Sequence, residues 1–187
     1  MRIIAKEEFL SKSLRFIKEI KDKIFVYPTD TIYGIGCDAT NDELVKKVRQ
    51  LKGSKIPFSI ITPSIKWVFE NCEEDKRLEG WMKKLPGPYT LVLKLKNSRA
   101  ISKEVTHGTD TIGVRIPDHW FTKVVHMLEV PIITTSANKA GENFMTSIED
   151  LNKEIKEKVD YVIDEGPIKG RPSTLIHFKE DIEVKER

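Results

Sequence analysis

Residues 27–36 read Tyr-Pro-Thr-Asp-Thr-Ile-Tyr-Gly-Ile-Gly, and the rest of the chain is organised around this stretch. An apolar, strand-like run at 24–27 stops at Pro28 and gives way to hydroxyl groups, one acid and two glycines. In an α/β protein, strand ends that turn polar in this way present ligand-binding groups. The alternative for this segment taken alone is a proline-initiated turn in which Thr and Asp side chains bond their own backbone.

The composition is that of one folded domain over residues 1–187. Hydrophobic residues make up 39% and charged residues 33% of the chain, so no disordered segment is expected. A net charge of +3 is too small to identify a nucleic-acid binder. No apolar run approaches the roughly 20 residues that span a bilayer, and Glu7 and Glu8 interrupt any signal-peptide core. We therefore expect a cytoplasmic protein with one site and no membrane partner.

The cysteines and histidines indicate neither a disulfide nor a metal centre. Cys37 and Cys72 are far apart and neither belongs to a C-x-x-C pair, which argues against a disulfide framework or a zinc site. The histidines, which lack the spacing of a metal-binding helix, are His107, His119, His126 and His177. We therefore expect no structural metal.

Apolar periodicity predicts alternating strands and helices. The expected strands lie at 2–4, 24–27, 58–62, 91–95, 111–116, 131–135, 161–163, 173–178 and 182–185. The expected helices lie at 6–20, at 41–52, from Ser64 onward, and at 75–84, 118–128 and 147–157, with a polar loop at 97–110. Asn41 or Thr40 is the expected cap of the second helix. Short connections between alternating elements predict a single α/β domain with a mixed sheet.

Small polar or cationic groups gather at five junctions between these elements, at 29–33, 52–55, 111–115, 134–138 and 173–174. Hydroxyls and backbone amides suit a phosphate or carboxylate, and Lys52 and Arg115 can neutralise such anions. Arg115 interrupts an apolar strand, so it is a site candidate unless it pairs with a structural carboxylate. Neither a G-x-x-x-x-G-K-[ST] loop nor a G-x-G-x-x-G fingerprint is present. These observations predict an anion-binding crevice for a nucleotide or an acidic metabolite.

Six segments of the chain resemble motifs of the YrdC/TsaC family, the L-threonylcarbamoyladenylate synthases, in their single-domain form. In family order they are P-T-D-T-I-Y-G-I-G-C-D-A at 28–39, K-G at 52–53, L-P-G-P-Y-T at 85–90, T-I-G-V-R-I-P-D at 111–118, T-S-A-N-K-A-G at 135–141 and P-S-T-L-I at 172–176. Each motif alone is weak, whereas six in order over nearly the whole chain are specific.

The resemblance implies a twisted mixed β-sheet, flanked by helices, around an open and positively charged cavity. It also implies a nucleotidyltransferase reaction in which L-threonine, bicarbonate and ATP, with Mg²⁺, give threonylcarbamoyl-AMP and pyrophosphate. That product serves the threonylcarbamoyladenosine modification of tRNA, which a separate tRNA threonylcarbamoyl-transferase complex completes.

The resemblance further implies roles for residues at the matching positions. The L-threonine contacts would be Thr31, Tyr33, Arg115, Thr134 and Ser173. The ATP contacts would be Lys52, Ser54, Lys55, Thr111, Ser136, Asn138 and Arg187. Lys52 would act at the phosphates and Arg115 would clamp the threonine carboxylate, which makes these two the catalytic residues.

The basic loop at 52–57 departs most from the family motif, which reads roughly K-G-R-P-x-x-K/N-P. Here the loop is shorter and Ser54 replaces the arginine. Lys55 supplies a charge nearby, but a lysine is a point charge and does not reproduce an arginine fork. The segment 143–146, Asn-Phe-Met-Thr, also replaces the usual Ser/Thr-rich run.

The implied chemistry is a task of positioning and electrostatics. Our hypothesis is that the amine of threonine captures CO₂ or bicarbonate as a carbamate, whose carboxylate attacks the α-phosphorus of ATP and expels pyrophosphate. Because that carboxylate is already ionised at neutral pH, the second step needs no protein base. Asp30 is a candidate partner for Mg²⁺ or for the amine.

Two alternatives belong to other functional classes. A double-stranded RNA- or tRNA-binding module of the same fold would bind RNA without nucleotide turnover. However, the chain lacks an RNP-like aromatic pattern, and Lys46, Lys47 and Arg49 fit the solvated face of a helix. The other alternative is a carbamoyl-transfer module similar to the related domain in hydrogenase maturation. Its larger parent proteins carry acylphosphatase-like and zinc-finger segments, which this sequence lacks.

Overall fold

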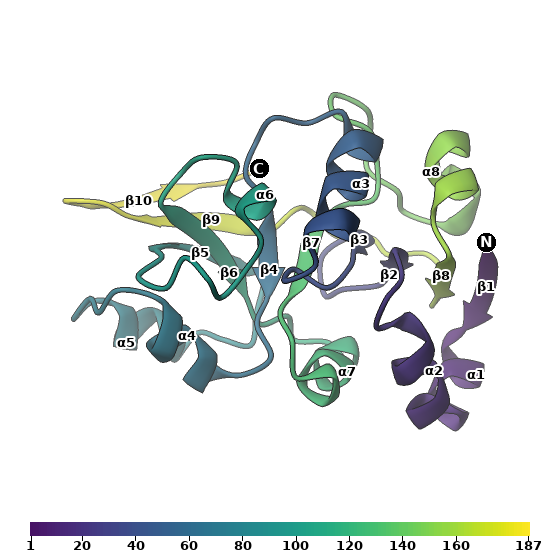
Figure 1. The fold of residues 1–187 in the computed structure, drawn as a ribbon, viewed down its shortest axis with the longest axis horizontal. Coiled ribbons are helices and arrows are strands. Elements are labelled where there is room, and N and C mark those ends of the chain that lie inside the picture. Colours follow the sequence, from purple (N-terminus) through teal and green to yellow (C-terminus); the bar gives the residue numbers. More distant parts are fainter.

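Ten strands form one mixed sheet in the structure of residues 1–187, a computed structural model (Figure 1). From one edge to the other the strands are β1 (Arg2–Ala5), β8 (Tyr161–Asp164), β2 (Phe25–Tyr27), β3 (Gly34–Gly36), β7 (Ile132–Ser136), β4 (Ser59–Ile61), β6 (Thr111–Arg115), β5 (Tyr89–Lys94), β9 (Thr174–Phe178) and β10 (Ile182–Lys185). The pairs β1–β8, β2–β8, β4–β6 and β5–β9 are parallel, and the others are antiparallel. The predicted mixed α/β sheet is therefore confirmed.

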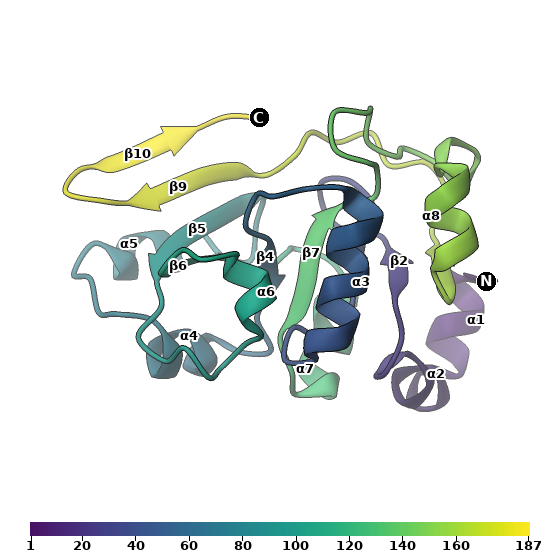
Figure 2. The same ribbon diagram turned by 45° about the horizontal axis from the view of Figure 1, so that its top comes forward.

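Helices cover both faces of the sheet (Figure 2). In chain order they are α1 (Lys6–Ser11), α2 (Ser13–Ile20), α3 (Asp42–Lys52), α4 (Ile65–Asn71), α5 (Leu78–Met82), α6 (Lys103–Thr106), α7 (Phe121–Leu128), the 3₁₀ turn η1 (Ile148–Asp150) and α8 (Lys153–Lys158). The predicted N-cap at Asn41 is confirmed, since its side chain accepts a hydrogen bond from the Leu44 amide. Ser64, predicted to open a helix, is the N-cap of α4, and its side chain accepts a hydrogen bond from the Trp67 amide.

Two apolar clusters lie on opposite faces of the sheet. Phe25 belongs to one cluster and its neighbour Val26 to the other, and Ile132 and Ile133 divide in the same way. This division follows from strand geometry, because successive side chains point to opposite faces. The larger cluster includes residues of α3 and α8, and the smaller includes residues of α1, α2 and α7. Burial on both faces explains why the strands are almost continuously apolar in sequence.

Strand β3 is absent from the predicted strands, because its Gly-Ile-Gly sequence lies within the stretch interpreted as a polar turn. It pairs antiparallel with β2 on one side and with β7 on the other. Its glycines permit this close approach: a Cβ atom at Gly36 would lie 2.3 Å from the Ile133 carbonyl oxygen and 2.9 Å from the Tyr27 ring. The stretch 27–36 is therefore a hairpin whose second strand joins the two halves of the sheet.

The predicted helix at 6–20 is divided into α1 and α2, which meet at Lys12. The backbone of Lys12 leaves the helical region there, with φ −125° and ψ 30°. Phe9 from α1 and Phe16 from α2 stack with their ring centroids 5.4 Å apart, and both belong to the smaller cluster. The break lets two aromatic rings from successive helices share one apolar site.

Three other predicted helices are shorter in the structure, and one predicted loop contains a helix. The helices expected at 75–84, 118–128 and 147–157 correspond to α5, to α7, and to η1 followed by α8. The expected loop at 97–110 contains α6, whose first turn is capped by the Ser102 side chain. A single helical turn has too few residues for an apolar period to reveal it.

Candidate active site

A cavity of about 360 Å³ lies beside the central strands of the sheet. Its walls come from β3 to β7, from the loops that follow β2, α3, β7 and β8, and from the C-terminal residue. Most of the predicted contacts line it together: Tyr33, Lys52, Ser54, Arg115, Thr134, Ser136, Asn138, Ser173 and Arg187. The predicted junctions, although far apart in sequence, therefore converge on one site.

Three predicted contacts lie outside the lining of this cavity. Thr31 is buried beneath it and reaches it through a hydrogen bond to Arg115. Lys55 is exposed on the loop that follows α3, and Thr111 begins β6, at the opposite end of the strand from Arg115. The roles of Lys55 and Thr111 as ATP contacts remain predictions.

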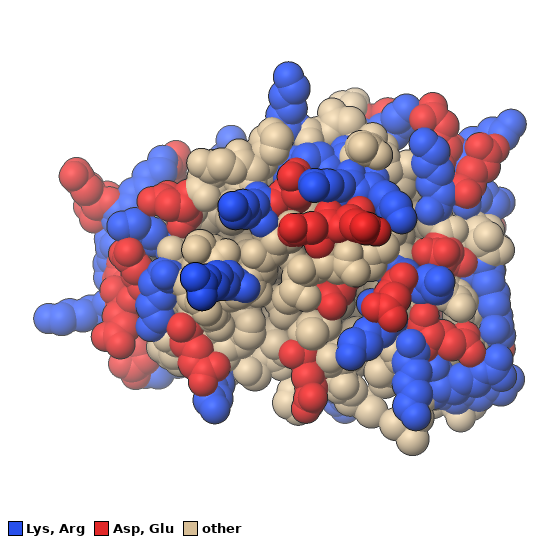
Figure 3. Space-filling view, viewed as in Figure 1, with Lys and Arg blue, Asp and Glu red and all other residues tan.

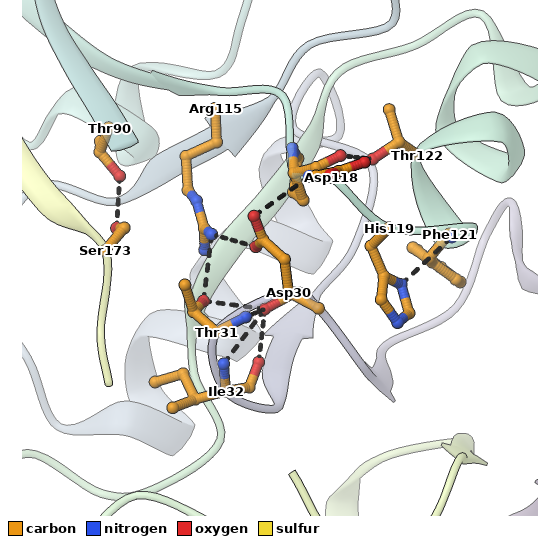
Figure 4. Close-up of polar contacts among 12 residues, drawn as sticks. Asp30, Thr31, Ile32, Thr90, Arg115, Asp118, His119, Phe121, Thr122 and Ser173 are labelled. Carbon is orange, nitrogen blue, oxygen red and sulfur yellow. Dashed lines mark hydrogen bonds and ion pairs between the residues drawn. The ribbon is translucent and has the colours of Figure 1, made fainter. Parts of the chain in front are cut away.

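Hydrogen bonds within the Pro-Thr-Asp-Thr segment hold it in a tight turn (Figure 4). The Thr29 hydroxyl donates to the Ile32 carbonyl at 2.7 Å and accepts from the amides of Thr31 and Ile32 at 3.2 and 3.3 Å. Thr29 thus does what the turn interpretation expects of it. The same turn aims the Asp30 carboxylate and the Thr31 hydroxyl at Arg115.

Arg115 lies at the end of β6, buried and partly satisfied. Its Nη2 atom donates to Asp30 Oδ1 at 2.9 Å and to the Thr31 hydroxyl at 3.1 Å. The other Asp30 oxygen accepts from the Asp118 amide at 3.1 Å. Arg115 therefore does pair with a structural carboxylate, which was the alternative for this residue. Its Nε atom, however, is buried without any acceptor, an uncommon and costly arrangement that a bound anion would relieve.

Arg187 and two hydroxyls form a second polar group beside Arg115. Arg187 donates from Nε to the Ser173 carbonyl at 3.0 Å and from Nη2 to the Ser173 hydroxyl at 2.7 Å. That hydroxyl is also 2.6 Å from the buried Thr90 hydroxyl. Burial and the positive charge of Arg115 both lower the pKa of Arg187. Two guanidinium groups thus share this wall, with the Asp30 carboxylate paired to only one of them.

Lys52 reaches from the end of α3 to the loop after β7. Its ammonium group donates to the Ser136 carbonyl at 2.6 Å, to the Asn138 carbonyl, and to Asn138 Oδ1 at 3.2 Å. Burial lowers the pKa of Lys52 to about 8. All these acceptors are neutral oxygens. Lys52 therefore holds the 136–138 loop in place and has no carboxylate as an ion-pair partner.

Tyr33 is one of the residues that line the cavity, and its hydroxyl group binds a neighbouring loop. The hydroxyl donates to the Gly166 carbonyl at 2.7 Å and accepts from the Glu165 amide at 3.0 Å. Burial raises the pKa of Tyr33 to about 12, so the phenol stays neutral at physiological pH. Tyr33 therefore ties the loop after β8 to the Pro-Thr-Asp-Thr turn.

Several lining residues were not among the predicted contacts. Thr90 lies within the quoted Leu-Pro-Gly-Pro-Tyr-Thr motif, and its position after two prolines at a strand start was the signal that could have identified it. Ile56, Phe58 and Phe144 form an apolar part of the wall. Apolar residues in loops resemble core or linker residues in sequence, so no pattern identifies these three.

The surface view shows acidic and basic side chains interspersed over the face of Figure 3. That face presents no continuous basic stripe of the kind that tracks a nucleic-acid backbone. No three His, Cys, Asp or Glu side chains lie together in an arrangement that could hold a metal ion. None of the helices combines the length and the apolar character needed to cross a bilayer.

The fold and the cavity define an α/β protein with a mixed sheet and, beside its central strands, a cavity lined by the cations Lys52, Arg115 and Arg187. The family model for the Sua5/YciO/YrdC proteins, described as telomere recombination, matches residues 19–185. The chain therefore belongs to this family, and the predicted resemblance is confirmed.

Relatives with assigned names agree with this placement. The chain is 37% identical to a Methanocaldococcus jannaschii protein provisionally named threonylcarbamoyl-AMP synthase, over 96% of this chain and 88% of that protein. It is 33% identical to the threonylcarbamoyl-AMP synthase of Pyrococcus abyssi, over 88% of this chain but only 49% of the relative. The crystal structure of P. abyssi Sua5 complexed with L-threonine superposes with a TM-score of 0.85 at 27% identity, covering 98% of this chain and 56% of that one. The chain thus spans about half the length of the Pyrococcus proteins.

Proposed function

We propose that this chain is a threonylcarbamoyl-AMP synthase, which joins L-threonine, bicarbonate and ATP and releases pyrophosphate. The names of its relatives support this reaction. The observation that carries the proposal is the charge balance of the cavity. Lys52 and Arg187 line it with no carboxylate in ion-pair contact, and Arg115 is the one lining cation with such a partner.

Lys52 is buried, and a buried cation that contacts only neutral oxygens is costly unless a ligand supplies the counter-charge. Arg187, which is more exposed, adds a second positive charge to the same cavity. A nucleoside triphosphate and a carboxylate together bring several negative charges to such a site. The cavity volume of about 360 Å³ lies within the range typical of small-molecule sites. Lys52 and Arg187 would therefore face the phosphates, while Arg115 would face the amino acid.

The threonine end of the cavity is the wall around Arg115. Its Nε donor has no acceptor in the protein, so a substrate carboxylate would give it one. Hydroxyls of Thr134 and Ser173 line the same cavity. The L-threonine complex of Pyrococcus Sua5, which has the same fold, supports threonine as the amino acid.

The nucleotide end would be formed by Ser54, Ser136, Asn138 and Arg187, with Lys52 holding the loop that carries two of them. Mg²⁺ would arrive bound to the phosphates, since no cluster of protein ligands is available and Asp30 is engaged by Arg115. Mg²⁺ would offset phosphate charge there. Lys55 and Thr111 remain proposed ATP contacts.

The reaction would proceed in two steps. Bicarbonate would take up a proton and release water to give CO₂. The threonine ammonium would lose one proton, its nitrogen would bond to the carbon of CO₂, and loss of a second proton from that nitrogen would give a carbamate. A carbamate oxygen would then bond to the α-phosphorus of ATP while the bond to the bridging oxygen breaks and pyrophosphate leaves. The protein would hold two anions together and offset their repulsion. The product would pass to a tRNA threonylcarbamoyl-transferase complex; direct contact with tRNA and a cytoplasmic location remain predictions.

Pyrophosphate release by the purified chain tests the proposal. Release should require L-threonine, bicarbonate and ATP together, and alanine in place of threonine should give little. The Arg115→Ala variant should need far more threonine while its folded structure, followed by circular dichroism, is retained. Release that is independent of threonine, or an unchanged threonine requirement in that variant, would contradict the proposal.

A further inference from the structure

Arg49 is a buried cation outside the predicted site. It lies on α3, 9% exposed, whereas its sequence context favoured a solvated helix face. The prediction was wrong because its guanidinium turns toward the loops at the end of α3 and stacks 4.2 Å from the centroid of the Phe58 ring. No carboxylate lies within ion-pair distance of it, and the Glu104 carboxylate acts on its charge only from further away.

The hydrogen bonds of Arg49 join the loop after α3 to the helix α6. Its Nη1 atom donates to the carbonyls of Ser54 and Ile56 at 2.8 and 3.1 Å. Its Nε and Nη2 atoms donate to the Glu104 carbonyl, within α6, at 3.1 and 2.5 Å. The planar guanidinium is the side chain best suited to such a bridge, because its donors point in fixed directions. Arg49 therefore ties the 54–56 part of the loop to α6, next to the buried Phe58, whose amide donates to the Val105 carbonyl at 2.9 Å.

The fastened loop is a wall of the cavity. Ser54, Ile56, Pro57 and Phe58 all line the cavity, yet Ile56 is 73% exposed, so burial of its own side chain does not hold the loop in place. The Gly53 residue before it adopts a left-handed conformation with φ +61°, which ends α3 and leaves the following residues without helical hydrogen bonds. Within this loop the only other side-chain hydrogen bond is the one from the Ile56 amide to the Ser54 hydroxyl.

We infer that Arg49 is a positioning residue for the nucleotide: it holds the 54–56 part of the loop in the shape that lines the cavity and places a positive charge without an ion-pair partner behind that wall. The identity of the ligand as a nucleoside triphosphate rests on the proposed function. Arg49 itself contacts only carbonyl groups and one aromatic ring, so it acts through the loop. Its loss should weaken ATP binding and leave threonine binding unchanged.

Two substitutions separate the bridge from the charge. Arg49→Met removes both, whereas Arg49→Lys keeps the charge and loses the fork that spans Ser54 and Ile56. Arg77→Met is the matched control, because Arg77 also donates to two loop carbonyls and lies over a phenylalanine ring, but it is outside the cavity lining. Each variant is assayed for the KM values of ATP and threonine in pyrophosphate release, and for the rate of tryptic cleavage after the exposed Lys55.

We expect Arg49→Met to raise the KM for ATP and the cleavage rate at Lys55 by about tenfold each. A change of this size corresponds to the loss of at least one hydrogen bond made by a charged group. The KM for threonine should stay within about twofold of the wild-type value. For Arg49→Lys, the KM for ATP and the cleavage rate at Lys55 should lie between the values of the wild type and of Arg49→Met. If Arg49→Met does not fold, an increase of both quantities in Arg49→Lys over the wild type decides the question. Arg77→Met should change neither ATP affinity nor cleavage at Lys55.

An Arg49 variant that is folded and keeps the wild-type KM for ATP and the wild-type cleavage rate at Lys55 would overturn the inference. Equal increases in the KM values of ATP and threonine would also overturn it, because they would indicate general loss of structure. If the wild-type chain releases no pyrophosphate at all, the proposed function fails, and cleavage at Lys55 still decides whether Arg49 holds this loop.

Discussion

Asp30→Asn should cost much more stability in the wild-type chain than in a chain that already lacks Arg115. The carboxylate of Asp30 is the one acidic partner of Arg115, with 2.9 Å between Oδ1 and Nη2. Both side chains are nearly buried, at 10% and 7% exposed. After the substitution, the guanidinium remains in the protein interior without a counter-charge.

Removing one partner of a buried ion pair costs about 3–5 kcal/mol, because the remaining charge is unpaired. Arg115→Met should cost a similar amount, since it leaves Asp30 unpaired. In the double variant no charge is left unpaired, so the total should be close to that of one single variant. The expected coupling free energy is therefore about 3 kcal/mol.

Urea unfolding of the four proteins at neutral pH, without ligands, measures this coupling. The control is the same cycle at Glu79 and Lys83, whose charged atoms lie 3.0 Å apart but whose side chains are 79% and 74% exposed. An exposed pair of this kind should show less than about 1 kcal/mol. A coupling at Asp30 and Arg115 as small as that of the control would refute the reasoning that burial makes this pair important.

Three further predictions concern other parts of the cavity. A Cβ atom at Gly170 would lie 1.7 Å from the Thr31 carbonyl oxygen, so Gly170→Ala should displace the loop after β8 and raise the KM for threonine about tenfold, whereas Gly80→Ala, with open space around it, should not. Burial lowers the pKa of Lys52 from its ordinary value of 10.5 to about 8, so folding is penalised while the buried amine is protonated. The penalty decreases as pH rises from about 8 to 10.5, because the folded protein has then lost a proton that the unfolded chain still holds. The wild type should therefore gain up to about 3 kcal/mol relative to Lys52→Met across that range in urea unfolding, and a constant difference would contradict this. Arg187→Met removes a cation that has no carboxylate partner, so the KM for ATP should rise about tenfold in pyrophosphate release; an unchanged KM would exclude phosphate contact.

The fold was predictable where local chemistry and tertiary packing agree. Strands buried on both faces are apolar runs of strand length, and α3 and α4 are preceded by the cap residues Asn41 and Ser64. Strand β3 was not predictable in this way. Its Gly36 lets the Ile133 backbone approach closely, and no local sequence pattern encodes that contact. The break at Lys12 likewise depends on the stacking of two rings from successive helices.

The site was predictable as a set of polar strand ends, and most of its residues do line one cavity. What the sequence could not supply was the direction of each side chain. The ammonium group of Lys52 binds the carbonyls of the 136–138 loop, contacts that the sequence did not reveal, and its place at the phosphates stays a prediction. Arg49 was expected in solvent, yet it lies beneath a cavity wall. Neither set of contacts could be read from the sequence, because carbonyl acceptors belong to the backbone and leave no mark on residue identity.

Mass spectrometry of the reaction product tests the central claim most directly. The purified chain is incubated with L-threonine, ATP and ¹³C-labelled bicarbonate, with alanine in place of threonine as the control. We predict a product with the mass of threonylcarbamoyl-AMP that carries the heavy carbon, forms in step with pyrophosphate, and is absent from the control. Formation of AMP or ADP without any ¹³C-labelled adenylate would contradict the proposed function.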